Sequence, residues 1–119
     1  MRLTSCLPYS TLRKMTPIRG EVWLFDLGMA EKVRPVLIVS SGYGDQDRAL
    51  ITVLPHTTAL RGSRYEVSID VPFLRQGAFL VQSIATYPAS RAIRRLGTLK
   101  QAQFETVFAE MLRWLGNTN

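Results

Sequence analysis

Short stretches of alternating or uninterrupted hydrophobic residues follow one another between residues 21 and 97. They are rich in β-branched and aromatic residues, and turn-forming Gly, Pro, Asp and Ser residues separate them. This pattern predicts strands over residues 21–27, 34–40, 49–54, 64–70 and 78–85, and a short strand or extended passage over 92–96. Short strands at this spacing are typical of a small barrel or sandwich.

The first two stretches also indicate how their strands are buried. The stretch 21–27 alternates, so its residues divide between two faces: Trp23, Phe25 and Leu27 on one, Val22, Leu24 and Asp26 on the other. The stretch 34–40 is a nearly continuous apolar run, which is typical of a buried strand. Pro35 suits the start of this strand, where no N–H is required of it.

The last part of the chain has a different period. Its apolar residues recur at intervals of three and four, which predicts one face of an amphipathic helix: Phe104, Val107, Phe108, Met111, Leu112 and Leu115. Thr98 and Gln101 have the spacing of a capping box, and Gly116 with Asn117 predicts the end of the helix. We expect the helix to close one side of the barrel. Its apolar face could instead form part of a partner interface.

The stretch from Val53 to Arg64 gathers chemically versatile side chains. Pro55 has no N–H to donate to a sheet, so we expect the backbone to leave the sheet there and to display the next residues at its edge. The residues displayed would be His56, Thr57, Thr58, Arg61 and Arg64. Together they supply an acid or base, hydroxyl donors and anion ligands. The alternative interpretation is a polar, solvated hairpin connection.

Charge adds a preference for the kind of partner. The net charge is +6 at pH 7, and 12 of the 15 Lys and Arg residues are arginine. Guanidinium groups match the geometry of phosphates, which favours a polyanionic partner. Positive charge that only keeps the protein soluble is the alternative.

Length and residue usage limit the class of protein. With 119 residues we expect one domain over 18–116, an N-terminal extension over 1–17 and a tail over 117–119. Residues 1–14 could arise from an upstream start, because Met15 directly precedes the patterned sequence. One cysteine, Cys6, and one histidine predict no disulfide, no metal site and a reducing, cytoplasmic setting. No apolar run approaches the roughly 18 residues of a membrane span, and the N-terminus is too polar for a secretory signal.

Four motifs, in this order and spacing, resemble one family. They are Arg19-Gly20-Glu21-Val22-Trp23, Arg34-Pro35-Val36-Leu37-Ile38-Val39-Ser40, Pro55-His56-Thr57-Thr58 and Arg94-Arg95-Leu96-Gly97. Over about residues 18 to 116 the chain resembles the MazF/PemK toxins of bacterial toxin–antitoxin systems. The resemblance implies an α+β fold that is mainly β, a small SH3-like barrel of the MazF, Kid and CcdB type with a C-terminal helix. It also implies a homodimer that acts, without metal or cofactor, as an endoribonuclease on single-stranded RNA and is silenced by a cognate antitoxin.

The reaction that this resemblance implies is attack of a ribose 2′-hydroxyl on the adjacent phosphate, which gives a 2′,3′-cyclic phosphate and a 5′-hydroxyl. Such a reaction needs a base, an acid, and cations or donors on the phosphate. By the family's Arg-Pro motif, Arg34 would be the phosphate clamp, and a salt bridge at the strand start is its alternative role. Thr57 would be the active-site threonine, with a turn cap as its alternative role.

His56 is not a regular position of the family motif. Its ordinary pKa of about 6.5 suits proton exchange at neutral pH, so we hypothesise that it is the general base or acid. A structural role beside a strand end is the alternative. The expected substrate-binding residues are Thr58, Arg61, Arg64 and Gln82, and a solvated hairpin tip is the alternative for the two arginines.

The chain also departs from the family pattern. One branch of the family has an Arg-x-Asp pair on the fifth strand for acid and base work, but here Leu80 and Gln82 occupy those places. The loop over 28–33 is shorter than in relatives, so the substrate sequence preference is open. Two other functions therefore stay open. One is a gyrase-binding toxin of the CcdB type, acting through the C-terminal helix near Trp114, and the other is a catalytically inactive barrel that binds RNA or an antitoxin.

Overall fold

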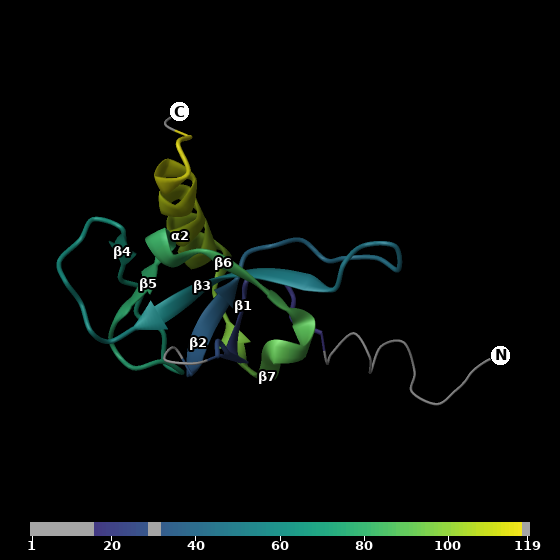
Figure 1. Cartoon of the computed structure of the whole chain (residues 1–119). Helices are drawn as coiled ribbons and strands as arrows, with labels where there is room; N and C mark the ends of the chain where they lie inside the picture. The colour runs from purple at the N-terminus through teal and green to yellow at the C-terminus, as the bar shows by residue number, and fades with distance from the viewer. Residues whose placement is uncertain (1–15, 29–31, 118–119) are drawn as a thin grey trace.

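The computed structural model describes residues 16–28 and 32–117. Within these ranges, seven short strands precede a long C-terminal helix (Figure 1). The strands are β1 Glu21–Asp26, β2 Val33–Ile38, β3 Leu50–Thr57, β4 Glu66–Val67, β5 Ala78–Leu80, β6 Ala85–Pro88 and β7 Ala92–Thr98. Two 3₁₀ turns, η3 Val81–Ser83 and η4 Ala89–Arg91, join the later strands, and the helix is α2, Gln101–Trp114. Cys6 lies outside the described residues.

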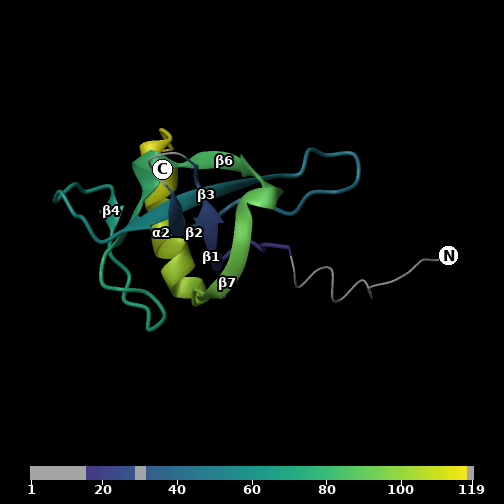
Figure 2. The same ribbon diagram turned by 60° about the horizontal axis from the view of Figure 1, so that its bottom comes forward.

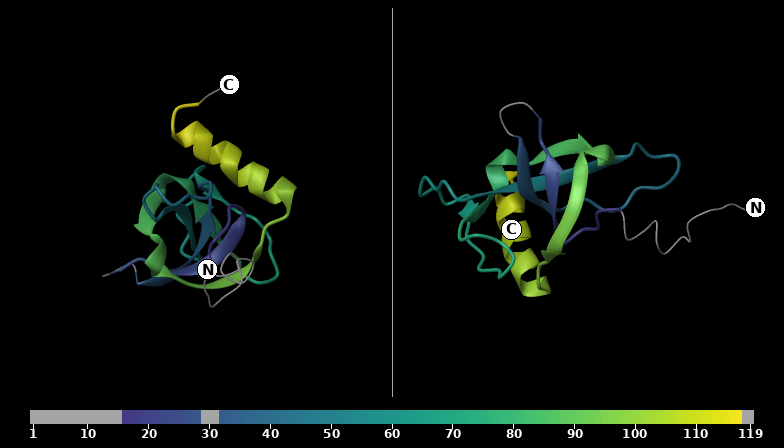
Figure 3. Two further views of the ribbon diagram at one scale, coloured as in Figure 1. Left: turned by 90° about the vertical axis from the view of Figure 1, so that its right-hand side faces the viewer. Right: turned by 90° about the horizontal axis from the view of Figure 1, so that it is seen from below.

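The strands pair antiparallel in a sheet that curls on itself. Their order is β4-β5-β3-β2-β1-β7, and β6 pairs with β3 beside this path. β3 is the central strand, because it pairs with β2, β6 and β5. Figures 2 and 3 show the curled sheet with α2 along one side. The expected mainly-β barrel with a C-terminal helix is confirmed.

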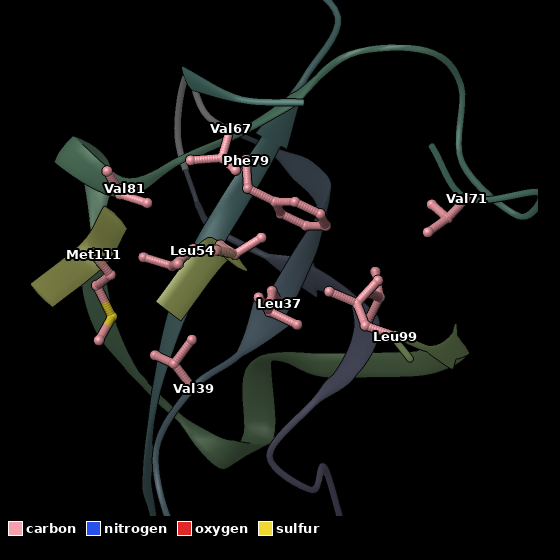
Figure 4. Close-up of a cluster of buried hydrophobic side chains, with 11 residues drawn as sticks. Leu37, Val39, Leu54, Val67, Val71, Phe79, Val81, Leu99 and Met111 are labelled. Carbon is pink, nitrogen blue, oxygen red and sulfur yellow. The ribbon is translucent and has the colours of Figure 1, made fainter. Parts of the chain in front are cut away.

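Both faces of the central strands are buried, each in its own hydrophobic core. In β1, Val22 belongs to the first core, whereas Trp23 and Phe25 belong to the second, as the alternation predicted. The apolar run of β2 divides in the same way, with Leu37 and Val39 in the first core and Val36 and Ile38 in the second. Val107 and Met111 of α2 complete the first core, so the helix does close this side of the barrel (Figure 4).

The start of α2 differs from the prediction. The side-chain oxygen of Gln103 accepts an N–H bond from Lys100 at 3.0 Å, directly before the first helical turn. The predicted capping box of Thr98 and Gln101 is wrong, because Thr98 still belongs to β7 and pairs with Glu21 of β1. The strand therefore holds Thr98 away from the position of a helix cap.

The end of α2 agrees with the prediction. Gly116 has a φ of +101°, and its N–H donates to the carbonyl of Arg113 while that of Asn117 donates to Leu112. This pair of bonds is a Schellman motif, which favours glycine at the left-handed position. Leu115 lies beyond the last turn and is 55% exposed, so it is not part of the buried stripe. No helix in the described part of the chain is long and apolar enough to cross a bilayer.

Pro55 does not take the chain out of the sheet, so that prediction is wrong. β3 continues through Pro55, which pairs with Val36 of β2. Thr52 accepts the N–H of Val39 on the β2 side, and the alternation of the strand therefore turns the nitrogen of Pro55 toward the opposite edge. On that edge β3 changes partner from β6 to β5, where the missing N–H leaves no partner unsatisfied. As a result, His56 is buried within the strand rather than displayed at its edge.

Two predicted strands are shorter than expected. The strand over 64–70 is reduced to β4, because the carboxylate of Glu66 folds the preceding loop onto itself by accepting three consecutive N–H bonds, from Arg61, Gly62 and Ser63. The strand over 78–85 divides into β5 and β6, because η3 turns the chain between them. Residues 92–96, predicted to be either a short strand or an extended passage, form a strand.

Candidate active site

Two cavities meet where β3 ends. The first, named here the Phe73 cavity, has a volume of about 480 Å³ and is lined by Arg34, Pro35, His56, Thr57, Thr58, Ala59, Phe73, Leu74, Arg75 and Leu96. The second, the Gln82 cavity, has a volume of about 440 Å³ and is lined by Arg34, Thr57, Ala59, Arg61, Ser63, Tyr65, Glu66, Leu80, Gln82 and Ser83. Arg34, Thr57 and Ala59 line both cavities and so form the wall between them.

The register of two neighbouring strands brings Arg34 and Thr57 together. Val36 of β2 pairs with Pro55 of β3, and the strands are antiparallel. Arg34 lies two residues before Val36 and Thr57 two residues after Pro55, so the same register sets them opposite each other. A guanidinium group and a hydroxyl group from different parts of the sequence therefore face one region of space.

Thr57 acts as a turn cap, as the alternative interpretation proposed. Its Oγ1 accepts the N–H of Ala59 at 3.0 Å, which fixes the side chain where the strand becomes loop. Accepting this bond uses a lone pair and leaves the O–H of Thr57 able to donate. Thr57 as a whole residue is only 9% exposed, so the surrounding protein holds its side chain in place.

His56 is enclosed by its neighbours. It is 5% exposed, and its ring meets the edge of Phe79 with a centroid separation of 5.0 Å and an interplanar angle of 72°. Its Nε2 is buried and has no hydrogen-bond partner among the described residues. Burial lowers the pKa of His56 below its ordinary value of 6.5, because the charged form loses hydration. At neutral pH the imidazole is therefore neutral, which suits a proton acceptor better than a proton donor.

The structure brings most of the predicted site residues together. Thr58 joins Arg34, His56 and Thr57 around the Phe73 cavity, whereas Arg61 and Gln82 line the Gln82 cavity. Gln82 lies on η3, at the place where one branch of the family would carry its Arg-x-Asp pair. The two groups share the wall of Arg34 and Thr57, so they form one composite site.

Arg64 does not join this site. Its guanidinium donates to the hydroxyl of Tyr65 at 2.6 Å and lies over the ring of the same residue, 4.8 Å from the centroid. Tyr65 in turn meets Trp114 of α2 with ring centroids 5.2 Å apart. Arg64 thus belongs to a contact between the loop and the helix, and it lines neither cavity.

Glu66 is the acidic residue that lines the composite site. Its carboxylate accepts the N–H groups of Arg61, Gly62 and Ser63 at 2.8 to 3.0 Å. The bond from the Arg61 N–H is the largest cause that lowers the pKa of Glu66, so the carboxylate is a weak proton acceptor. No group of His, Cys, Asp and Glu side chains suited to hold a metal ion occurs in the described ranges.

Phe73 and Arg75 line the site but were not singled out from the sequence. They belong to the loop before β5, which returns to β3 at the pair of Thr57 with Ala78. The Phe73-Leu74-Arg75 sequence, an aromatic and a basic residue close together before Gly77, is the signal that could have suggested them.

A third cavity, of about 540 Å³, lies apart from this site between Arg19 and α2. The guanidinium of Arg19 lies over the ring of Phe108, 4.5 Å from its centroid, and over that of Phe104 at 5.1 Å. The lining contains none of the predicted site residues. The candidate active site is therefore the end of β3, where chemically different side chains converge.

The chain is similar in sequence to a known protein family and similar in fold to solved structures. The model of the PemK-like, MazF-like toxins of type II toxin–antitoxin systems matches residues 18–115. No curated protein matches the chain in sequence. The fold is similar to that of solved MazF structures, and three of these illustrate the range of similarity.

An endoribonuclease from Mycobacterial species, solved in complex with its cognate antitoxin, is 24% identical, with a TM-score of 0.74 over 87% of this chain and 98% of that one. A MazE–MazF structure from Deinococcus radiodurans is 19% identical, with a TM-score of 0.71 over 85% and 96%. The Mycobacterium tuberculosis toxin MazF-mt6 is 27% identical, with a TM-score of 0.67 over 80% and 95%. Because the family match covers nearly all of the described residues, this chain belongs to the PemK-like, MazF-like toxin family of type II toxin–antitoxin systems.

Proposed function

We propose that this toxin is an endoribonuclease that cleaves single-stranded RNA without a metal ion. In the proposed reaction a ribose 2′-hydroxyl attacks the adjacent phosphate and the bond to the 5′ oxygen breaks. The products are a 2′,3′-cyclic phosphate and a 5′-hydroxyl. The observation that carries this proposal is the wall of Arg34 and Thr57, where a cation and a hydroxyl donor face two cavities at once.

Arg34 and Thr57 would stabilise the charge that develops on the phosphate. The guanidinium of Arg34 can donate two parallel bonds to phosphate oxygens. The O–H of Thr57 can donate a further bond from a side chain that is already fixed by Ala59. Donors held in place before the reaction lower the barrier without reorganisation.

His56 would accept the proton of the 2′-hydroxyl. It is neutral at neutral pH because burial lowers its pKa, and it is one of the residues that line the Phe73 cavity. Glu66 does not suit this task, because its carboxylate is engaged by three backbone N–H groups. The leaving 5′ oxygen would take up a proton from water, which gives the 5′-hydroxyl product. Thr58, Arg61 and Gln82 would contact the rest of the substrate.

The partners of this toxin can be inferred from its family and its charge. The Mycobacterial endoribonuclease was captured with its cognate antitoxin, and we propose the same kind of partner here. A net charge of +6 favours an acidic segment in that antitoxin and also attracts RNA. We further propose that the protein acts in the cytoplasm as a homodimer, with residues 18–116 as its toxin domain.

A ribonuclease fits better than the two alternatives. The family match is to PemK-like and MazF-like toxins, and Trp114, which suggested a gyrase contact, packs against Tyr65. An inactive RNA-binding or antitoxin-binding barrel is favoured by one observation. Leu80 and Gln82 stand in place of the Arg-x-Asp pair of one branch of the family.

Incubation of the purified protein with end-labelled RNA in EDTA tests the proposal. We expect fragments that end in a 2′,3′-cyclic phosphate and begin with a 5′-hydroxyl. RNA that is bound but intact would favour the inactive barrel, and RNA that is neither bound nor cut would favour a protein target. Cleavage that EDTA prevents would contradict the metal-independent mechanism.

A further inference from the structure

The two cavities differ in chemistry although they share a wall. The Phe73 cavity is lined mainly by apolar and aromatic side chains, and the exposed Arg75 lies at its border. The Gln82 cavity is lined largely by amide, hydroxyl and charged groups. If the phosphate binds at the wall, as in the proposed function on which this inference rests, each cavity receives one of the two neighbouring nucleosides.

Gln82 is the group in its cavity best suited to recognise a base. Its side chain is exposed, and its carboxamide makes no hydrogen bond to any described residue. By contrast, the hydroxyl of Ser63 accepts the N–H of Tyr65, and the carboxylate of Glu66 binds the loop backbone. A carboxamide offers a donor and an acceptor side by side, which matches the edge of a nucleobase.

Phe73 is suited to stacking rather than to hydrogen bonding. Its ring packs against β7 at Gly97, where a Cβ atom would come within 2.6 Å of a ring carbon. Only glycine at this position lets the ring lie so close to the strand. Phe73 is half-buried, so the strand supports the ring while part of it stays accessible from the cavity. Bases stack on such rings with little dependence on their identity.

We propose that the Gln82 and Phe73 cavities are subsites for the two nucleosides that flank the scissile phosphate. Gln82 selects one base by hydrogen bonds, and Phe73 holds the other by stacking. The cleavage preference of the toxin is then strict on one side of the scissile phosphate and relaxed on the other. Gln82 is in this sense a specificity-determining residue, and it takes no part in proton transfer.

Abasic ribonucleotides test this assignment, because they keep the 2′-hydroxyl and the phosphate and remove only the base. Three oligoribonucleotides with one cleavage site are compared: the intact one, and one each with an abasic residue on the 5′ or the 3′ side of the scissile phosphate. For the wild-type protein we expect each abasic residue to lower kcat/KM about tenfold. The same three substrates are then given to Gln82→Ala, Phe73→Leu and, as a control, Gln46→Ala, whose exposed side chain lies in the loop at the opposite end of β3.

The expected result is a crossed pattern. In Gln82→Ala an abasic residue on one side of the scissile phosphate should no longer lower kcat/KM, whereas an abasic residue on the other side still should. Phe73→Leu should show the opposite assignment of sides. In Gln46→Ala both abasic residues should still lower kcat/KM. Loss of the same effect in both variants, or persistence of both effects in Gln82→Ala, would overturn the subsites while leaving cleavage, and hence the proposed function, intact. Because Phe73 packs on Gly97, thermal unfolding of its variant is measured first, and should it fail to fold, Gln82→Ala decides alone. Absence of any cleavage by the wild-type protein would instead remove the proposed function and this inference together.

Discussion

Gly77 lies so close to Thr57 that a Cβ atom at residue 77 would collide with the carbonyl oxygen of Thr57. The same atom would stand 2.9 Å from Cε1 of His56. Here the loop that carries Phe73 and Arg75 returns to β3, and the next residue, Ala78, pairs with Thr57. The absence of a side chain at Gly77 therefore sets the distance between that loop and the site.

Gly77→Ala is expected to destabilise the protein and to weaken cleavage. Backbone atoms must move to admit the methyl group, which costs about 2 kcal/mol in well-packed sites and lowers the Tm by about 10 °C in a domain of this size. Thermal unfolding and kcat/KM are measured on the same preparation. Gly42→Ala is the control, because nothing lies within 4 Å of a Cβ there. Equal Tm values for the two variants would show that the close approach is not required.

Arg34→Ala is expected to lower kcat/KM by about 10²- to 10³-fold, because the phosphate loses its cationic donor. Arg34→Lys keeps the positive charge but lacks the paired donors, so its kcat/KM should lie between that of the wild type and that of Arg34→Ala. Arg48→Ala, in the exposed loop before β3, serves as the control for a lost positive charge. If Arg34→Ala cleaves RNA with a kcat/KM like that of the wild type and has the same Tm, Arg34 is not the phosphate clamp.

The pH dependence of cleavage is expected to follow His56. As a base it works in its neutral form, so kcat/KM should rise with pH and level off, with a midpoint below 6.5 because burial lowers the pKa. His56→Ala should lose this rise together with about 10²-fold or more of the rate. A rise that survives unchanged in His56→Ala would remove this imidazole from proton transfer.

The stability of the protein should also depend on pH through His56. Unfolded histidine takes up its proton near pH 6.5, whereas the folded protein does so only at lower pH. Below pH 6.5 the unfolded state therefore holds more protons, and the free energy of unfolding should decrease as the pH falls through this window. Urea unfolding at several pH values measures the effect, and His56→Leu, which does not titrate, should show a smaller decrease. An identical decrease in the variant would assign the pH dependence to other groups.

Glu66→Gln is expected to loosen the loop that carries Arg61. The amide has one acceptor oxygen, so it cannot replace both carboxylate oxygens that bind the N–H groups of Arg61, Gly62 and Ser63. Amide hydrogen exchange at these three residues should become faster than in the wild type. Because the pKa of Glu66 is lowered in the folded protein, its stabilisation is complete above pH 4.5 and is lost at lower pH. Asp45→Asn, an exposed carboxylate in another loop, is the control, and equal exchange rates in both variants would contradict this role.

The elements that depend on local patterns could be predicted from the sequence. The alternation in 21–27 specified which side chains of β1 share a core, and the three-and-four spacing specified the buried face of α2 through Val107 and Met111. Gly116 marked the end of the helix, because the left-handed conformation there favours glycine. These features depend on residues a few positions apart, so their signals are complete within one stretch of sequence.

The features that depend on distant partners could not be predicted in this way. Whether Pro55 leaves a sheet depends on which edge of β3 its nitrogen faces, and that is decided by the pairing of β3 with β2, β5 and β6. The strand over 64–70 is shorter than predicted for a local reason that hydrophobic alternation does not reveal, because the carboxylate of Glu66 binds N–H groups of its own loop. Phe73 enters the site through a contact with Gly97, which is far from it in the sequence.

The sequence by itself determined the fold class, the helix face and, through the family resemblance, the pair of Arg34 and Thr57. Only the tertiary structure decided that His56 is buried and that Arg64 binds the hydroxyl of Tyr65 rather than joining the site. It also decided that Arg34 and Thr57 form the wall shared by two chemically different cavities. The physical reason is that hydrophobic periodicity acts along a strand or helix. Burial, strand register and cavity shape arise only when segments that are distant in the sequence pack against one another.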